Sequence, residues 1–145
     1  LYFIFTHFTQ NSILRDKILE REKEIRTIDR NEKIYLLYID QNKYKSVKSI
    51  YGKYMSERVQ DIFVATFKST EDYEEALRIA EKVINFCSDN YLVENHIISV
   101  TLNIGVACYP CDSKNMEELI RNADTAMMQA RKTGFNVIHK YDKQS

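Results

Sequence analysis

The sequence has no excess of charge of either sign. Its 145 residues carry 21 Lys and Arg against 21 Asp and Glu, so the formal net charge is zero and the pI is near 7.0. A neutral protein has no overall field that would draw it to nucleic acid or to an anionic membrane. We therefore expect no nucleic-acid partner, and any affinity for phosphate must come from a local cluster of side chains.

Cysteines and long apolar runs are also scarce. The three cysteines are few and odd in number, and no secretion signal of basic, apolar and small residues is present. These absences favour a reducing, cytoplasmic setting. The apolar residues 1–5 are far shorter than the roughly 20 that span a bilayer, so we interpret them as the start of a packed helix. We expect no direct membrane insertion of this domain.

What the sequence does contain fits a single globular core. It has 145 residues, 44% of them hydrophobic, and shows no internal repeat, low-complexity tract or linker. This length and composition predict one domain over residues 1–145. Because the chain starts without Met, we expect it to be a piece of a longer protein.

The first half of the chain predicts helices and strands in alternation. Residues 11–28 place leucine and isoleucine at helical spacing among charges, which predicts an amphipathic helix. Residues 34–39 are apolar on both faces, as expected of a central strand covered on two sides. The other elements predicted here are a helix at 43–50 broken near Gly52, a helical turn at 55–60 and a strand at 62–67.

The second half gives clearer signals. Ser69 and Thr70 with the acids that follow have the form of a capping box, which predicts a helix over 73–86. Apolar and polar residues alternate over 96–110, as in a half-buried strand. The remaining predicted elements are a long helix at 115–132 closed by Gly134 and a short strand at 137–138. Helices packed on one sheet make an α/β domain.

Asp40 follows the apolar run 34–39 at the point where that predicted strand ends. Several lysines and a Tyr-Gly turn come directly after it, an arrangement that could hold a metal ion and a phosphate. An aspartate at such a place is more often a turn or cap residue, and lysines in a cluster more often form a solvated face. Residues alone therefore leave both interpretations open.

Cys108 and Cys111 have the spacing found in zinc and redox sites. No second pair accompanies them, so we do not predict a metal site there.

Several segments, in order along the chain, resemble the GGDEF domain, the catalytic module of diguanylate cyclases. The segment FTHFTQNSIL at 5–14 is similar to the family's LTGLPNRxxF, and YIDQNKYKSVKSIYGK at 38–53 to LDxDxFKxINDxYGH. Residues 69–83 resemble TSxEEAxxxAExI. The most specific matches are TLNIGVACYP at 101–110 with VTxSIGVAxYP, and ADTAMMQARKTGFN at 123–136 with ADxAMYxAKxxGRN. The resemblance implies a nucleotidyl cyclase palm-like central sheet with helices packed on it.

The resemblance also implies roles for individual residues. Asp40 matches the family's first metal-ligating aspartate, and Gln41 the residue whose backbone carbonyl completes that site. Magnesium prefers such oxygen ligands, and two cations can polarise the attacking hydroxyl and neutralise the triphosphate. The residues that match nucleotide-binding positions are Lys45, Lys48, Glu57 and Arg131.

At two of the matched positions a contact expected from the family is lost. Lys48 replaces an asparagine that reads the guanine edge, and Phe135 replaces an arginine that clamps phosphate. Arg131 replaces a lysine and keeps its charge with a different donor geometry. Losing two such contacts would weaken GTP binding about a hundredfold or more.

The signature hairpin of the family has no clear counterpart. One alignment makes Asp61 the second catalytic carboxylate but puts Val59 and Gln60 where the family has two glycines, and a β-branched residue there would block close approach of substrate. A second takes residues 58–61 as the family's inhibitory RxxD site. In a third, the natural chain has further residues between Val59 and Asp61, because a fold lacking a helix and a strand here would expose an edge of its central strand.

The sequence thus predicts a degenerate GGDEF-type regulatory domain of cyclic-di-GMP signalling from a larger bacterial protein. It would bind GTP or a related guanine nucleotide, with Mg²⁺, without turning it over, or would only pass signals to other domains of the same chain or to a second copy in a homodimer. If the larger protein is anchored in a membrane, this domain would lie on the cytoplasmic side. The alternative is an active diguanylate cyclase that condenses two GTP to cyclic-di-GMP.

Overall fold

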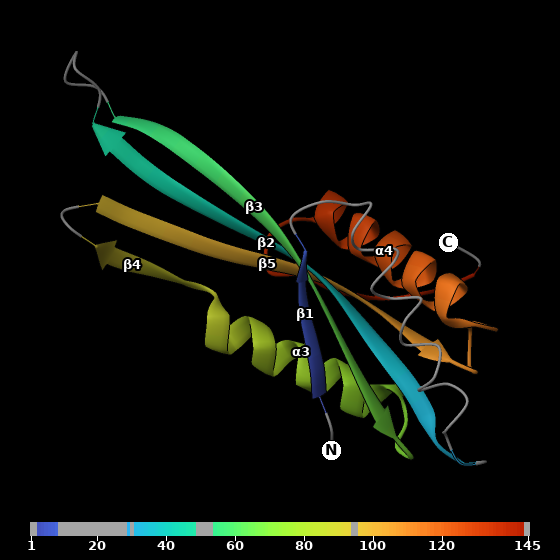
Figure 1. Ribbon diagram of the computed structural model, residues 1–145. Helices are drawn as coiled ribbons and strands as arrows, with labels where there is room; N and C mark the ends of the chain where they lie inside the picture. Colours follow the sequence, from blue (N-terminus) through green and yellow to red (C-terminus); the bar gives the residue numbers. More distant parts are fainter. Residues whose placement is uncertain (1–2, 9–28, 30, 49–53, 94–95, 144–145) are drawn as a thin grey trace.

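The computed structural model describes residues 3–8, 29, 31–48, 54–93 and 96–143 (Figure 1). The amphipathic helix predicted at 11–28 lies outside these residues. The strands are β1 (Phe3–Phe8), β2 (Lys33–Lys48), β3 (Tyr54–Ser69), β4 (Asp89–Val93), β5 (His96–Tyr109) and β6 (Ile138–Lys140). They form one sheet in the order β1-β3-β2-β5-β4, in which β6 pairs with β5 in parallel and all other pairs are antiparallel.

The strand β2 lies in the middle of this sheet. It pairs along its whole length with β3, from Lys33 opposite Ser69 to Lys48 opposite Tyr54, and up to Lys45 with β5. The outer edge of β3 is covered in turn by β1. The sequence predicted that a shortened domain would leave a strand edge exposed, but β1 pairs with that edge. This strand includes residues 3–5, where the start of a packed helix was predicted.

In the described part of the chain, one helix covers each face of the sheet (Figure 1). Helix α3 spans Tyr73–Cys87 and begins at Asp72, whose carboxylate accepts from the Glu74 N–H at 3.1 Å. The predicted helix at 73–86 is confirmed, but its cap is Asp72 rather than Ser69 or Thr70. Helix α4, predicted at 115–132, spans Met116–Thr133 between its cap Asn115 and Gly134, whose φ of 148° suits glycine.

Alternation along β2 divides the core into two layers. Ile34, Leu36 and Tyr38 pack against α4, whereas Tyr35, Leu37 and Ile39 pack against α3, and all six side chains are buried. A strand covered on both faces must be apolar at every position, which is why residues 34–39 form a continuous apolar run. The α/β class and the central strand predicted from the sequence are confirmed.

Helix α4 lies directly on β5 at Gly105. A Cβ built at Gly105 would lie 2.0 Å from the Ala123 carbonyl oxygen and 2.2 Å from the Met127 amide nitrogen. These are backbone atoms and cannot move aside alone, so the close contact requires glycine. It sets the distance between the middle of α4 and the sheet.

Three predicted elements are wrong, the first being the helix start at 1–5, where the described residues belong to β1. The helices expected at 43–50 and 55–60 belong, over their described residues, to β2 and β3, which pair with each other from Lys43 opposite Val59 onward. On its other side, β2 pairs with β5 as far as Lys45 opposite Ile98. Local preference for helix is weak, and the backbone partners on both sides of β2 override it.

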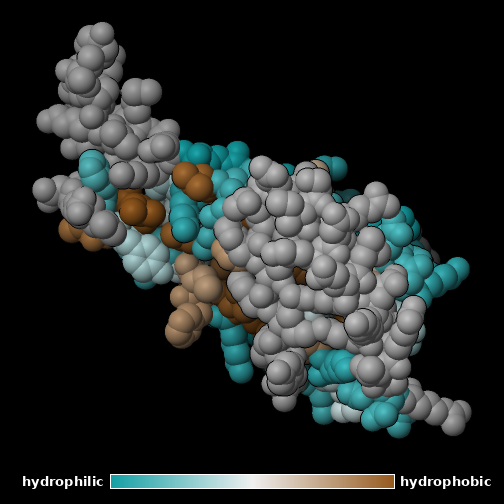
Figure 2. Space-filling model, viewed as in Figure 1, coloured by the Kyte–Doolittle hydropathy of each residue, from teal (hydrophilic) through white to brown (hydrophobic). Residues whose placement is uncertain are grey.

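A group of hydrophobic side chains is exposed where β4, the start of β5 and the end of α3 meet (Figure 2). Its members are Phe86, Tyr91, Leu92 and Ile97. Exposed apolar side chains are common on soluble proteins, so this group by itself defines no binding site.

Candidate functional site

The candidate site is built around Asp40, which is 0% exposed in the middle of β2. Its neighbours across the ladder are Ile62 on β3 and Asn103 on β5. A buried carboxylate is costly unless other groups satisfy its charge and its lone pairs. The surroundings of Asp40 therefore have to supply hydrogen-bond donors.

Three side chains donate to the two carboxylate oxygens of Asp40. Oδ1 accepts from Gln60 Nε2 at 2.7 Å. Oδ2 accepts from Arg131 Nη2 at 2.9 Å and Nε at 3.1 Å, and from Asn42 Nδ2 at 3.3 Å. The guanidinium group of Arg131 is thus the counter-charge of Asp40, held by two hydrogen bonds.

Each donor comes from a different place in the fold. Arg131 reaches the sheet from the last turn of α4, and its side chain is 37% exposed. Asn42 lies two residues beyond Asp40 on the same face of β2, and its own Oδ1 accepts from Arg58 Nε at 2.9 Å. The site therefore joins β2, β3 and α4 through one chain of polar contacts.

Arg131 also affects two titratable neighbours. Burial raises the pKa of Asp124 above its usual value, and Arg131 lowers it in part. Burial raises the pKa of Tyr38 to about 12, with contributions from Asp124 and Asp40 that Arg131 again opposes. The positive charge of Arg131 thus partly offsets the effect of burial on the pKa of Asp124 and of Tyr38.

The structure does not bring Asp61 to Asp40. Asp61 is paired with Gln41 in the ladder, so both project from the face opposite to Asp40. The residues on either side of Asp61 agree with this, because Gln60 donates to Asp40 on the α4 side and Ile62 packs with the α4 layer.

The predicted nucleotide-binding residues are placed only in part. The backbone of Lys45 lies opposite that of Glu57 in the β2–β3 ladder, and Lys48 lies opposite Tyr54. The side chains of Lys45, Lys48 and Glu57 lie outside the described part. Of the predicted site residues whose side chains are described, the structure brings Asp40 and Arg131 together. The catalytic, metal and nucleotide-binding roles remain predictions.

The arrangement around Asp40 does not fit a magnesium ion. Mg²⁺ needs oxygen atoms with free lone pairs, whereas the side chains that face Asp40 present N–H donors and a positive charge. Within residues 3–8, 29, 31–48, 54–93 and 96–143, no three His, Cys, Asp or Glu residues form a possible metal site.

The donors Gln60 and Asn42 were missed from the sequence. Gln60 was considered only as a replacement for glycine. Asn42 has strand spacing from Asp40, a signal that was hidden because the helix predicted at 43–50 ended the strand too early. A metal site is recognised by oxygen acceptors, so the predicted Mg²⁺ site gave no signal for the N–H donors that satisfy Asp40.

Comparison with known proteins identifies the family. The model of the family described as "Diguanylate cyclase, GGDEF domain" matches residues 59–137, more than half of the chain. The chain therefore belongs to the GGDEF domain family, a domain family of cyclic-di-GMP signalling. The resemblance seen in the sequence is confirmed.

Individual relatives agree with this assignment. The bifunctional diguanylate cyclase/cyclic di-GMP phosphodiesterase MucR of Pseudomonas aeruginosa is 28% identical over 87% of this chain and 21% of its own length. The GGDEF domain of YfiN from Pseudomonas aeruginosa has a TM-score of 0.64 at 14% identity, covering 91% of this chain and 95% of that one. The active GGEEF domain of a Vibrio cholerae diguanylate cyclase has a TM-score of 0.55 at 14% identity, covering 92% and 97%.

The chain spans about a fifth of the length of the curated relatives it matches. In the described part of the chain, neither helix has the length and apolar character needed to cross a membrane.

Proposed function

We propose that this chain is a regulatory GGDEF domain of cyclic-di-GMP signalling that does not itself make cyclic-di-GMP. The observation that carries the proposal is the saturation of Asp40 by donors from Arg131, Gln60 and Asn42. Asp40 matches the carboxylate that holds the metal in catalytic members of the family. Here the guanidinium group of Arg131 binds this carboxylate in place of a metal ion. Catalysis would require Arg131 to leave a buried partner.

The placement of Asp61 supports the same proposal. A cyclase needs a second carboxylate next to the first, so that two cations can bind one triphosphate. Here Asp61 projects from the α3 face of the sheet and Asp40 from the α4 face. The sheet itself separates the two groups.

The proposal has a nucleotide-binding form and a scaffold form. In the first, GTP or a related nucleotide binds through Lys45, Lys48, Glu57 and Arg131 without turnover. In the second, the domain passes signals to other domains or to a second copy. The engagement of Arg131 with Asp40 favours the scaffold form, because the arginine expected to bind phosphate already has an anionic partner.

The test is incubation of the purified protein with GTP and Mg²⁺, followed by chromatographic separation of the nucleotides. We expect no cyclic-di-GMP above the level of a heat-denatured sample, and no difference between the wild type and Asp40→Ala. The active Vibrio cholerae domain serves as the positive control for the assay. Product that forms with the wild type and disappears with Asp40→Ala would refute the proposal.

The alternative function is an active diguanylate cyclase. It is favoured by the 28% identity with MucR, a protein named for both cyclase and phosphodiesterase activities. The same incubation decides between the two. Titration calorimetry with GTP then separates the two regulatory forms: heat of binding supports the nucleotide form, and its absence supports the scaffold form.

A further inference from the structure

A disulfide bond joins Cys108 to Cys111 at the end of β5, three residues apart in the sequence. Cys108 is the penultimate residue of β5 and is 0% exposed. Cys111 lies in the turn that leads to α4 and is exposed. The pair thus joins a residue buried in the core to a residue exposed at the surface.

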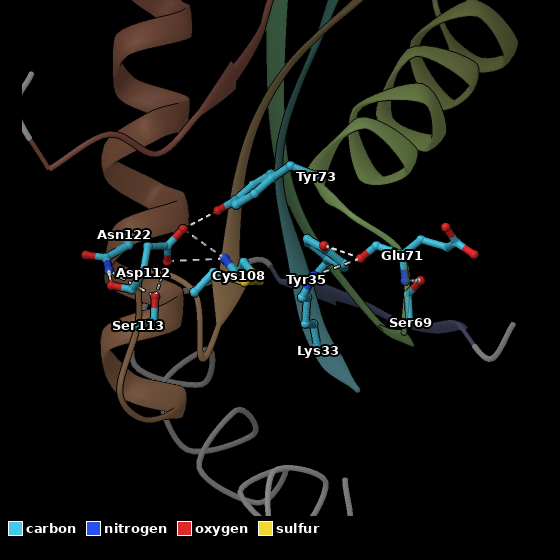
Figure 3. The surroundings of a disulfide bond; sticks show 10 residues. Lys33, Tyr35, Ser69, Glu71, Tyr73, Cys108, Asp112, Ser113 and Asn122 are labelled. Atoms are coloured by element: carbon cyan, nitrogen blue, oxygen red, sulfur yellow. Dashed lines mark hydrogen bonds between the residues drawn. A yellow bond between two sulfur atoms is a disulfide. The ribbon is translucent and has the colours of Figure 1, made fainter. Parts of the chain in front are cut away.

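The turn that carries Cys111 is held by the next residue, Asp112 (Figure 3). The Asp112 carboxylate accepts hydrogen bonds from the Tyr73 hydroxyl, from the Cys108 N–H at 3.2 Å and from Ser113 Oγ at 2.5 Å. Its backbone carbonyl accepts from Asn122 Nδ2 at 3.3 Å. Because Tyr73 begins α3 and Asn122 belongs to α4, this turn connects the helices on the two faces of the sheet.

Cys111 also lines an open pocket beside this turn. Two lysines, Lys33 and Lys140, line the same pocket, and Lys140 Nζ lies 4.4 Å from the centre of the Tyr73 ring. Glu32 and Asp72 line it as well, so the pocket is mixed in charge. An attacking thiolate is attracted by nearby cations, and the pocket gives it a route to Cys111.

We propose that Cys108 and Cys111 form a reversible thiol–disulfide exchange site that is reduced by dithiols. A thiolate of the dithiol attacks Sγ of Cys111, the Cys108–Cys111 bond breaks, and its electron pair goes to Sγ of Cys108, which takes a proton from the medium. The second thiolate of the dithiol then attacks the first sulfur of the dithiol, which is bound to Sγ of Cys111. Sγ of Cys111 leaves as a thiolate. The dithiol is oxidised to a disulfide, and the protein gains two thiols.

The direction of attack follows from the difference in exposure. Cys111 is an exposed residue that lines the pocket, whereas Cys108 is enclosed by the α3-side core layer, so we infer that a thiolate reaches Sγ of Cys111 first. The reduced turn loses the covalent link that keeps Asp112 next to the Cys108 N–H. The redox state of the pair would therefore alter the contacts of Asp112 with α3 and α4. This inference is independent of whether the domain makes cyclic-di-GMP.

The first test counts free thiols by alkylation and intact mass. After mild oxidation, the denatured protein should take one label, on Cys87, and after treatment of the native protein with dithiothreitol it should take three. We expect reduction of the native protein within about tenfold of the rate measured in denaturant, because the attacked residue is already exposed. Three labels after oxidation, or reduction only upon unfolding, would overturn the proposal.

The second test establishes which sulfur is attacked. In a Cys87→Ser background, the monothiol glutathione should form a mixed disulfide on Cys111 and not on Cys108. As matched single-thiol variants, Cys108→Ala should react with the alkylating agent at least about tenfold faster than Cys111→Ala. Equal rates, or glutathione on Cys108, would contradict the assigned direction. Circular dichroism of both variants verifies that each is folded.

The third test follows the structural consequence. Hydrogen exchange at the Cys108 amide and in the first turn of α3 should become about tenfold faster or more on reduction, because Asp112 is no longer held by the disulfide. The reduced Cys87→Ser protein is compared with the oxidised one, so that the free thiol of Cys87 plays no part. Unchanged exchange in both segments would show that the pair does not control the turn, and would refute that step.

Discussion

Replacing Arg131 with methionine tests the ion pair on which the site depends. Methionine keeps the length and apolar stem of the side chain but removes the guanidinium group. Asp40, which is 0% exposed, then keeps only the amide donors of Gln60 and Asn42. A buried carboxylate without its counter-charge should destabilise the folded state strongly.

The expected loss follows from the burial of the two partners. Removing one partner of a fully buried pair costs about 3–5 kcal/mol. Because the Arg131 side chain is 37% exposed and two other donors remain, we take the low end, about 3 kcal/mol. For a domain of this size, that loss lowers the thermal midpoint by about 10 °C.

The partner substitution should cost less. In Asp40→Asn the remaining arginine can turn toward solvent, so we expect a loss of about 1–2 kcal/mol. Arg121→Met on the exposed side of α4 is the matched control and should change stability by less than about 0.5 kcal/mol. Urea unfolding followed by circular dichroism gives all three values.

The order of the three variants decides whether the reasoning is correct. If Arg131→Met costs no more than Arg121→Met, then Asp40 does not depend on Arg131 for its charge balance. If Asp40→Asn is the more damaging of the pair, the arginine rather than the carboxylate carries the burial cost. Either result would remove the physical basis of the proposed regulatory role.

Three further predictions concern the metal, the packing of α4 and the effect of alkali. Mg²⁺ should leave the thermal midpoint unchanged, whereas a ligand at about 100 times its Kd would stabilise the protein by about 2.7 kcal/mol. Gly105→Ala should destabilise by about 3 kcal/mol or more, or prevent folding, because its Cβ would overlap the backbone of Met127; circular dichroism measures this. Burial raises the pKa of Tyr35 and of Tyr38 from 10.0 to about 12. Because the pKa of each phenol is higher in the folded state than in the unfolded state, the protonated tyrosines contribute stability that is complete below pH 10 and is lost as the pH rises through about 12. Phenolate absorbance and circular dichroism should therefore change together over this range.

The parts of the fold that the sequence predicted are those with a strong local signal. The run 34–39 is apolar at every position because β2 is covered on both faces. The alternation over 96–110 located a strand correctly, but its half-buried interpretation was wrong, because residues 102–108 of β5 are all buried and small or polar residues such as Gly105 lie beneath α4. Helix α4 has a cap at one end and glycine at the other. Each of these patterns is contained in a short stretch of chain, so sequence reasoning could find it.

The parts that were missed depend on distant partners. Nothing within residues 43–48 or 55–60 specifies a strand as strongly as the ladder between β2 and β3 does. The short strand β4, which was not predicted, likewise depends on its pairing with β5. In the site, Asp40 and Arg131 were found by resemblance, but their contact joins residues 91 positions apart. Their pairing with each other could not be derived from spacing alone.

The opposite orientation of Asp40 and Asp61 has a consequence for attempts to restore synthesis. Because successive side chains of a strand point to alternate sides, no exchange of one amino acid for another can carry Asp61 across the sheet. Moving Asp61 itself would require a bulge or a one-residue change in chain length between Asp61 and the buried part of β3 that begins at Val64, because that part fixes the register. A second carboxylate beside Asp40 is therefore better introduced at Gln60, whose side chain already contacts Asp40 on the α4 face, than by moving Asp61.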